Sequence, residues 1–195
     1  LKAILMDEPF SNLDSNLRKE ICNYTLQTLK KNNIPVIFVT HDIEEAMSIS
    51  NRIIIMKNGR ILQIDTPKKI YSNPHNKCVA EMLGLINQFE IESDANGKLY
   101  TPFGSINCNK CKKKSKFCAQ KKHFCVIRPE NLVVGKKGVK AKIINKYFLG
   151  ASWAYQLELG EKLPLLNISN CKREFKVNQF IRVSTSKKNI LIFKE

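Results

Sequence analysis

The first fifteen residues constrain the fold more than any other part of this 195-residue chain. An apolar run over residues 3–6 ends abruptly in two adjacent carboxylates, Asp7 and Glu8. An unbroken apolar run of this length is typical of a strand that is buried on both faces of a parallel sheet. Ligands of such sheets bind beyond the carboxyl ends of the strands, so both carboxylates are expected where a ligand would bind.

Two kinds of chemistry suit this carboxylate pair. One is to hold a hard cation such as Mg²⁺, which prefers oxygen ligands and keeps several of its waters. The other is to orient or deprotonate an attacking water molecule. The residue types by themselves leave both uses open.

A second apolar run, residues 35–40, ends at His41 and Asp42. Between the two runs, apolar residues recur at helical spacing up to about Lys31, and Asp14 or Ser15 can cap that helix. If the two strands are parallel, His41 is expected at the same sheet edge as the two carboxylates. Asp42 is expected to cap the next helix.

These motifs resemble those of ATP-binding-cassette (ABC) ATPases. Residues 4–9, Ile-Leu-Met-Asp-Glu-Pro, resemble the Walker B motif. Residues 11–14 resemble the D-loop, and residues 39–42 resemble the segment that carries the switch histidine. Residues 50–61 resemble the closing strand pair of the same domain. The resemblance implies that residues 1–87 form an α/β fold, the C-terminal portion of a P-loop NTPase domain with a parallel sheet and helices.

The resemblance also implies roles for single residues, with ATP and Mg²⁺ as the cofactors. Asp7 would hold Mg²⁺ through a water molecule. Glu8 and His41 would be catalytic: Glu8 polarises the water that attacks the γ-phosphate, and His41 contacts that phosphate and fixes the geometry around Glu8. Asp14, in the D-loop, would lie at a dimer interface, a role that is compatible with capping a helix.

Three other motifs of the family are not in the sequence. They are the phosphate loop G-x-x-x-x-G-K-[ST], the glutamine loop and the Ser-Gly-Gly-Gln signature. In the family all three precede the Walker B strand. Because the chain also begins at Leu1, we expect it to be the C-terminal part of a longer ATPase, through truncation, domain excision or a split gene. The chain alone is then expected to be inactive in ATP hydrolysis.

The sequence pattern changes near residue 88. The apolar segments that follow are short and alternating, with turn signals at close spacing, which predicts a small all-β barrel or sandwich over residues 88–195. Residues 126–132, Val-Ile-Arg-Pro-Glu-Asn-Leu, resemble the start of the OB-like barrel, or TOBE domain, of solute importers. The resemblance implies a regulatory domain.

The formal net charge of +16 is concentrated in the second half of the chain. Residues 1–87 contain 11 Lys and Arg against 9 Asp and Glu, whereas residues 88–195 contain 22 against 8. Such a charge permits nucleic-acid binding by an OB-like domain, but no aromatic-interleaved reader motif accompanies it, so no nucleic acid is expected. A solvated lysine-rich surface is favoured, with attraction to anionic lipid headgroups as the alternative.

Four of the seven cysteines, Cys108, Cys111, Cys118 and Cys125, could together supply four thiolates to Zn²⁺. Iron–sulfur ligation is an alternative. However, one C-x-x-C pair followed by two isolated cysteines is not a regular ligand spacing. A lysine-rich surface loop with free thiols is favoured instead, and we expect no bound metal there.

Together these features predict part of an ABC-type ATPase that couples ATP hydrolysis to solute uptake. Ferric iron is the first candidate solute and a polyamine the second, with sulfate, molybdate and sugars also carried by this group. The family implies a homodimer of ATPase subunits, transmembrane permease subunits, an indirect link to a periplasmic or surface solute-binding protein, and a peripheral position at the cytoplasmic face of the cell membrane. The alternative from another class is a non-hydrolytic binding or regulatory module built on the OB-like barrel.

Overall fold

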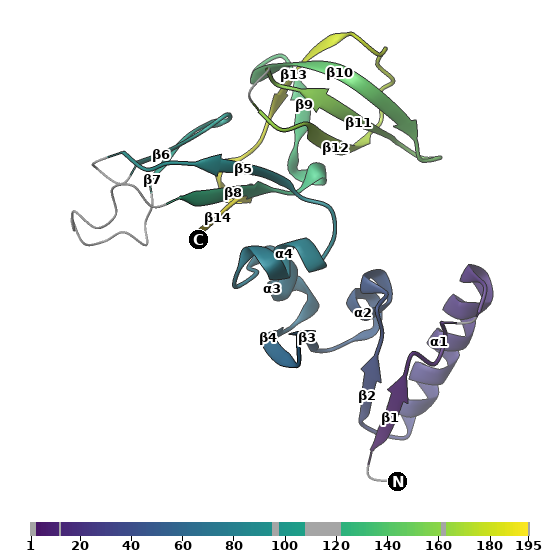
Figure 1. Cartoon of the computed structure of the whole chain (residues 1–195). Coiled ribbons are helices and arrows are strands. Elements are labelled where there is room, and N and C mark those ends of the chain that lie inside the picture. The colour runs from purple at the N-terminus through teal and green to yellow at the C-terminus, as the bar shows by residue number, and fades with distance from the viewer. Residues whose placement is uncertain (1–2, 12, 95–97, 108–121, 161–162, 195) are drawn as a thin grey trace. The chain divides into compact units, whose positions relative to one another are not determined.

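The computed structural model describes residues 3–11, 13–94, 98–107, 122–160 and 163–194. These residues form a mixed structure with many strands and few helices, as Figure 1 shows. The chain divides into two compact units, Leu1–His75 and Asn76–Glu195. Among the described helices, none combines the length and the apolar character that crossing a bilayer requires.

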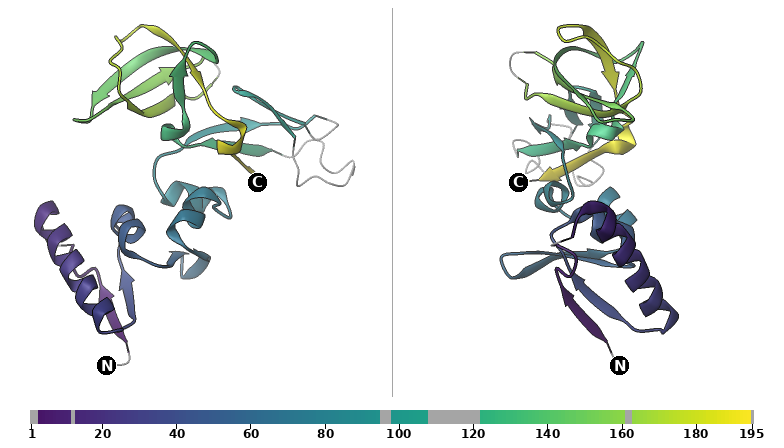
Figure 2. Two further views of the ribbon diagram at one scale, coloured as in Figure 1. Left: turned by 180° about the vertical axis from the view of Figure 1, so that it is seen from behind. Right: turned by 90° about the vertical axis from the view of Figure 1, so that its right-hand side faces the viewer.

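The first unit begins with a parallel strand pair. Strand β1 (Ile4–Asp7) pairs with β2 (Val36–Val39), and helix α1 (Ser15–Lys31) connects them. The register places Asp7 opposite Val39, so the residues that follow each strand leave the pair at the same edge. The two views in Figure 2 agree that α1 runs beside this pair. The parallel pair that the two apolar runs predict is therefore present.

Only one face of this strand pair is covered, whereas the apolar runs predict burial on both faces. Phe10, which follows β1, is buried and packs against Phe38 of β2, with 5.8 Å between the ring centroids. On the other face Leu5, Ile37 and Val39 are 75%, 60% and 53% exposed. Within the described residues, nothing packs over these three side chains, and this accounts for the difference.

A hairpin follows in the first unit, and Asn58 and Gly59 form its turn. Strands β3 (Ile53–Lys57) and β4 (Arg60–Asp65) pair antiparallel. The φ angles of Asn58 and Gly59 are 51° and 71°, and a two-residue turn of this kind matches the twist of the flanking strands.

Two short helices complete the first unit, α2 (Ile43–Ile49) and α3 (Pro67–Ser72). The segment after α3 is fixed by the side chain of Gln63, which is 3% exposed. Gln63 Nε2 donates to Asn73 O at 3.1 Å, and Gln63 Oε1 accepts from His75 N at 2.7 Å. One buried amide thus satisfies two backbone groups that would otherwise lose their hydrogen bonds.

The second unit is built of antiparallel strands, with one short helix, α4 (Lys77–Met82), at its start. One sheet has the order β12-β11-β10-β13-β9, another has the order β14-β8-β5, and β6 and β7 form a hairpin. The strands are β5 (Asn87–Ile91), β6 (Lys98–Thr101), β7 (Gly104–Asn107), β8 (His123–Ile127), β9 (Val133–Gly135), β10 (Val139–Phe148), β11 (Trp153–Glu158), β12 (Leu166–Cys171), β13 (Phe180–Ser184) and β14 (Ile190–Lys194). This arrangement is consistent with an OB-like β unit.

The two larger sheets share one apolar core, to which Phe89 and Ile127 contribute from one sheet and Ile143 and Leu157 from the other. A buried side chain also joins them. Asn87 of β5 is 2% exposed; its Nδ2 donates to the backbone oxygen of Asn167 in β12 at 2.7 Å, and its Oδ1 accepts from the backbone N–H of Asn167 at 2.6 Å.

The border between the units lies between residues 75 and 76, upstream of the change in composition at residue 88. Helix α4 belongs with the second unit because its Ala80 packs in one cluster with Val126 and Phe193. Farther along, Arg128 Nη1 donates to Gly84 O at 3.2 Å. The assignment of residues 1–87 to an ATPase portion and of residues 88–195 to a regulatory domain remains a prediction.

Candidate functional site

Glu8, directly after β1, has an unusual backbone conformation. Its φ angle is +43°, a region that non-glycine residues rarely occupy, and Pro9 follows it. Three hydrogen bonds hold this conformation: Glu8 N donates to Val39 O at 2.9 Å, and Ser11 donates to Glu8 O from both N (3.2 Å) and Oγ (3.0 Å). Backbone strain of this kind persists where neighbouring contacts fix it, and it is frequent at functional sites.

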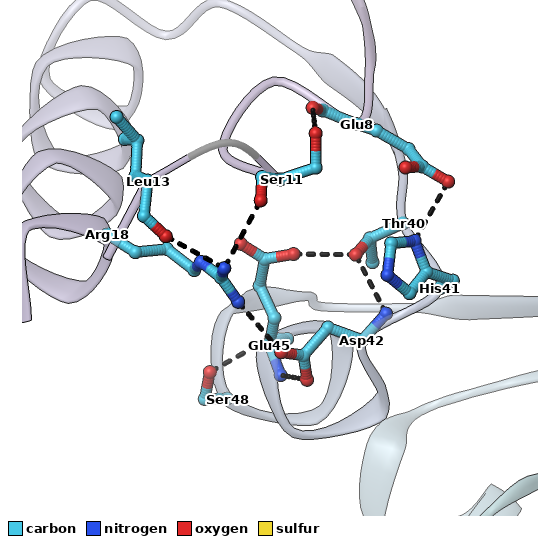
Figure 3. Close-up of polar contacts among 9 residues, drawn as sticks. All are labelled: Glu8, Ser11, Leu13, Arg18, Thr40, His41, Asp42, Glu45 and Ser48. Atoms are coloured by element: carbon cyan, nitrogen blue, oxygen red, sulfur yellow. Dashed lines mark hydrogen bonds and ion pairs between the residues drawn. The ribbon is translucent and has the colours of Figure 1, made fainter. Parts of the chain in front are cut away.

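The carboxylate of Glu8 contacts the imidazole of His41, which lies at the same sheet edge as predicted. His41 Nδ1 donates to Glu8 Oε1 at 2.9 Å, as drawn in Figure 3. The hydrogen bond to Glu8 raises the pKa of His41 above 6.5, and the charges of Glu8 and, to a smaller extent, Asp42 act in the same direction. Both side chains are open to solvent, at 43% and 74% exposure, so a ligand can reach them.

The residues on either side of His41 are fixed at the start of α2. Asp42 is the N-cap, and its Oδ1 accepts from Glu45 N at 3.1 Å, as the sequence predicts. Thr40 Oγ1 donates to Glu45 Oε2 at 2.6 Å and accepts from Asp42 N at 3.0 Å. Thr40 and Asp42 are thus both held by the first turn of α2, which limits the positions that His41 can occupy.

A small hollow lies beside the Glu8–His41 pair. The guanidinium of Arg18 borders it and contacts Leu13 O, Ser11 O and the carboxylate of Asp42. Sequence reasoning did not identify Arg18, because backbone oxygens as partners leave no sequence pattern. The residues that line the hollow are Glu8, Phe10, Ser11, Arg18, Thr40, His41, Asp42 and Glu45.

Asp7 and Asp14, the other two predicted site residues, lie nearby in the chain but are not among the residues that line this hollow. Asp7 is the last residue of β1 and its side chain is exposed. Asp14 caps α1, because its Oδ1 accepts from Leu17 N at 3.1 Å. An exposed aspartate beside Glu8 suits a Mg²⁺ ion that keeps most of its waters. Among the described residues no three His, Cys, Asp or Glu side chains gather into a fully protein-built metal site.

Of the four predicted metal-ligand cysteines, the structure describes Cys125, and the other three (Cys108, Cys111 and Cys118) lie outside the described residues. Cys125 is completely buried in the apolar core of the second unit. Burial raises its pKa to about 12, so the neutral thiol is strongly favoured. The expectation that the four cysteines bind no metal stays a prediction.

Several known proteins that are similar to this chain are described as import ATP-binding proteins. An Fe(3+) ions import ATP-binding protein of Fusobacterium nucleatum is 36% identical over 175 residues, which are 86% of this chain and 46% of that protein. A spermidine/putrescine import ATP-binding protein of Clostridioides difficile is 34% identical over 177 residues, 88% of this chain and 48% of that protein. A protein of the same description from Legionella pneumophila is 37% identical over 135 residues, 68% of this chain and 37% of that protein.

The chain thus spans about half or less of the length of these relatives. No family model matches the sequence. The similarity nevertheless extends over most of the chain, through both structural units, and it includes relatives described for different solutes. With Glu8 and His41 in contact at the ends of two parallel strands, the chain belongs to the family of ATP-binding subunits of ABC importers.

Proposed function

We propose that this chain is the C-terminal portion of an ATP-hydrolysing subunit that drives solute import across a membrane. The 2.9 Å contact between Glu8 Oε1 and His41 Nδ1, at the same edge of a parallel strand pair, is the observation that carries the proposal. It joins a carboxylate that can act on water to a cationic or neutral hydrogen-bond donor that can act on a phosphate.

In this proposal Glu8 is the group that acts on the attacking water. One carboxylate oxygen, Oε1, is engaged by His41, and a carboxylate has a second oxygen that can accept a hydrogen bond from water. The contact holds the Glu8 carboxylate in one orientation. Phosphoryl transfer depends mainly on positioning and electrostatics, so a fixed carboxylate and an adjacent imidazole are the contributions expected of this chain.

The residues fit Mg²⁺ and a water molecule better than they fit ATP itself. Asp7 would hold Mg²⁺ through water, and the ion, when bound, neutralises charge on the phosphate oxygens. Phosphates of ATP are normally cradled by backbone N–H groups and a lysine of the G-x-x-x-x-G-K-[ST] loop, and the sequence has no such loop. A complementary segment would have to supply that cradle.

The descriptions of the relatives as import ATP-binding proteins support a proposed assembly. Two ATPase subunits would form a homodimer, with Asp14 near the interface. The dimer would bind transmembrane permease subunits at the cytoplasmic face of the membrane, and these would receive the solute from a solute-binding protein. Residues 88–195 would be the OB-like regulatory domain of the subunit.

Ferric iron is the solute we propose first, and a polyamine is the alternative. The protein of Fusobacterium nucleatum that is described for Fe(3+) ions is similar over 86% of this chain, and spermidine/putrescine proteins are similar over comparable spans. Uptake of radiolabelled iron and of radiolabelled spermidine, in cells that do and do not express the complete transporter, separates these two solutes.

The catalytic proposal is tested by Glu8→Gln in a protein that is completed with the phosphate-loop half. The amide cannot accept a proton from water, so ATP binding should persist while steady-state hydrolysis falls by at least about 100-fold. His41→Ala should also abolish turnover. Glu44→Gln is the matched control, since Glu44 is an exposed residue in the first turn of α2. Near-normal hydrolysis in Glu8→Gln would remove Glu8 from its proposed role.

A further inference from the structure

We propose that Arg18 is a positioning residue, which sets the separation of Glu8 and His41 by tying the loop after β1 to the start of α2. The inference rests on the proposed function in one respect, since Glu8 and His41 are taken as the pair that acts on the attacking water. The contacts that support it belong to the structure and do not depend on any nucleotide.

Arg18 lies in the first turns of α1, and its side chain reaches the loop before the helix. Side chains in a helix lean toward its N-terminus, so this position brings the guanidinium back over that loop. Nη2 donates to Leu13 O at 2.9 Å and to Ser11 O at 3.4 Å, and Nη1 contacts Asp42 Oδ2 at 3.5 Å. Figure 3 shows the guanidinium between the loop and the start of α2.

These contacts close a ring that contains the Glu8–His41 pair. Ser11 is bonded to Glu8 through the Glu8 carbonyl oxygen, at 3.0 Å from its hydroxyl. Asp42 is joined to His41 by the peptide bond, and His41 Nδ1 returns to Glu8 Oε1 at 2.9 Å. Arg18 is the link between Ser11 and Asp42. A change at Arg18 therefore alters the spacing of two residues that it does not itself touch.

The ring needs the shape of arginine as well as its charge. A guanidinium presents several N–H donors in a planar fork, so it can reach two backbone oxygens and a carboxylate together. The side chains of Arg18 and Asp42 are 30% and 36% exposed, so solvent screens their attraction only in part. A lysine at this position keeps the charge but has one nitrogen, which cannot span the same acceptors. Arg18→Lys therefore separates positioning from charge.

The experiment is NMR spectroscopy of the 195-residue chain and its Arg18→Lys variant, above the titration of His41. The bond to Glu8 favours the Nδ1–H tautomer of His41, and ring nitrogen shifts report its population. The variant should lower that population several-fold and speed exchange of the Glu45 amide roughly threefold to tenfold. Amides of β1 and β2 should exchange as before. Arg52→Lys, at an exposed arginine of the same unit, is the matched control.

Two outcomes would overturn the inference. One is an unchanged tautomer population and an unchanged Glu45 amide in Arg18→Lys. The other is faster exchange throughout the unit, β1 and β2 included, because that result shows a general loss of stability. These readouts need no nucleotide, so they hold even where a completed protein fails to hydrolyse ATP.

A second variant keeps the test decisive if Arg18→Lys folds poorly. Asp42→Asn retains the oxygen that caps α2, since asparagine is a good N-cap, but it lacks the carboxylate that Arg18 contacts. It should reproduce the change in the His41 tautomer. The double variant should add little to either single variant, because both break the same link. Additive changes in the His41 tautomer population would show that Arg18 and Asp42 act independently, and this would contradict the ring of contacts.

Discussion

At the residue scale, the protonation of His41 is linked to the stability of the first unit. The hydrogen bond to Glu8 raises the pKa of His41 above 6.5 in the folded chain. This contribution to stability is therefore complete below about pH 6.5 and is lost as the pH rises through the folded pKa. An NMR titration should place the midpoint of His41 above 6.5, and Glu8→Gln should lower it. A midpoint that stays the same in the variant would contradict the contact.

Single residues also mark what the sequence can predict at the site. Asp42 was predicted as a cap because the residue type and the following acidic turn are local signals. The position of His41 at the same edge as Glu8 was predicted because parallel strands end at one edge, whereas their direct contact was not. Arg18 was not predicted, because its partners are brought near only by the folded loop. The positive φ of Glu8 was not predicted either, since glutamate carries no local preference for it.

At the scale of elements, Gly138 permits the close approach of the chain before β10 to Val183 of β13. Its φ is +117°, and a Cβ atom there would lie 2.1 Å from Val183 O. Gly138→Ala should therefore lower the free energy of unfolding by about 2–4 kcal/mol, through strain and backbone displacement. Urea denaturation can be followed through the single tryptophan, Trp153, which lies in the same sheet.

Gly135→Ala is the control for this prediction, since a Cβ atom at Gly135 meets nothing within 4 Å. Its effect should stay within about 1 kcal/mol. Equal losses of unfolding free energy in the two variants would contradict the prediction, because the approach of Val183 would then have no effect of its own at Gly138.

Elements with short-range signals were predicted closely, and those set by distant partners were not. The helix up to Lys31, with its cap at Asp14, and the cap of α2 at Asp42 follow from adjacent residues. The hydrogen bonds between the two sheets join Asn87 to Asn167, which are 80 residues apart, and no local sequence pattern predicts them. The exposed face of β1 and β2 was not predicted either. An apolar run shows that both faces of a strand are apolar, but it does not show whether other residues pack on each face.

At the scale of the whole molecule, the second unit should reach its full stability only if it includes α4. A fragment of residues 76–195 keeps Ala80 against Val126 and Lys77 over the ring of Phe124, at 4.2 Å. A fragment of residues 88–195 loses both contacts and also the two buried hydrogen bonds between Asn87 and Asn167, so it should be less stable by about 3 kcal/mol or more. Urea denaturation of the two fragments measures the difference. Equal stabilities would place the boundary nearer residue 88.

A further expectation at this scale concerns nucleotide binding by the 195-residue chain on its own. The sequence contains no phosphate loop, and the described site offers carboxylates and an imidazole. Because those groups do not cradle phosphates, the chain should neither bind Mg-ATP tightly nor hydrolyse it. Isothermal titration and a phosphate-release assay measure both. Micromolar affinity with sustained turnover would mean that the nucleotide binds elsewhere.

The uncovered face of the first strand pair, with Leu5, Ile37 and Val39, would make the stability of the first unit depend on the concentration of any molecule that covers it. Any molecule that covers these side chains in the folded state, but not in the unfolded state, adds free energy in proportion to the logarithm of its concentration. The melting temperature of this unit then depends on the concentration of that molecule as well as on the sequence. Where the cover is a second copy of the chain, dilution alone should lower it.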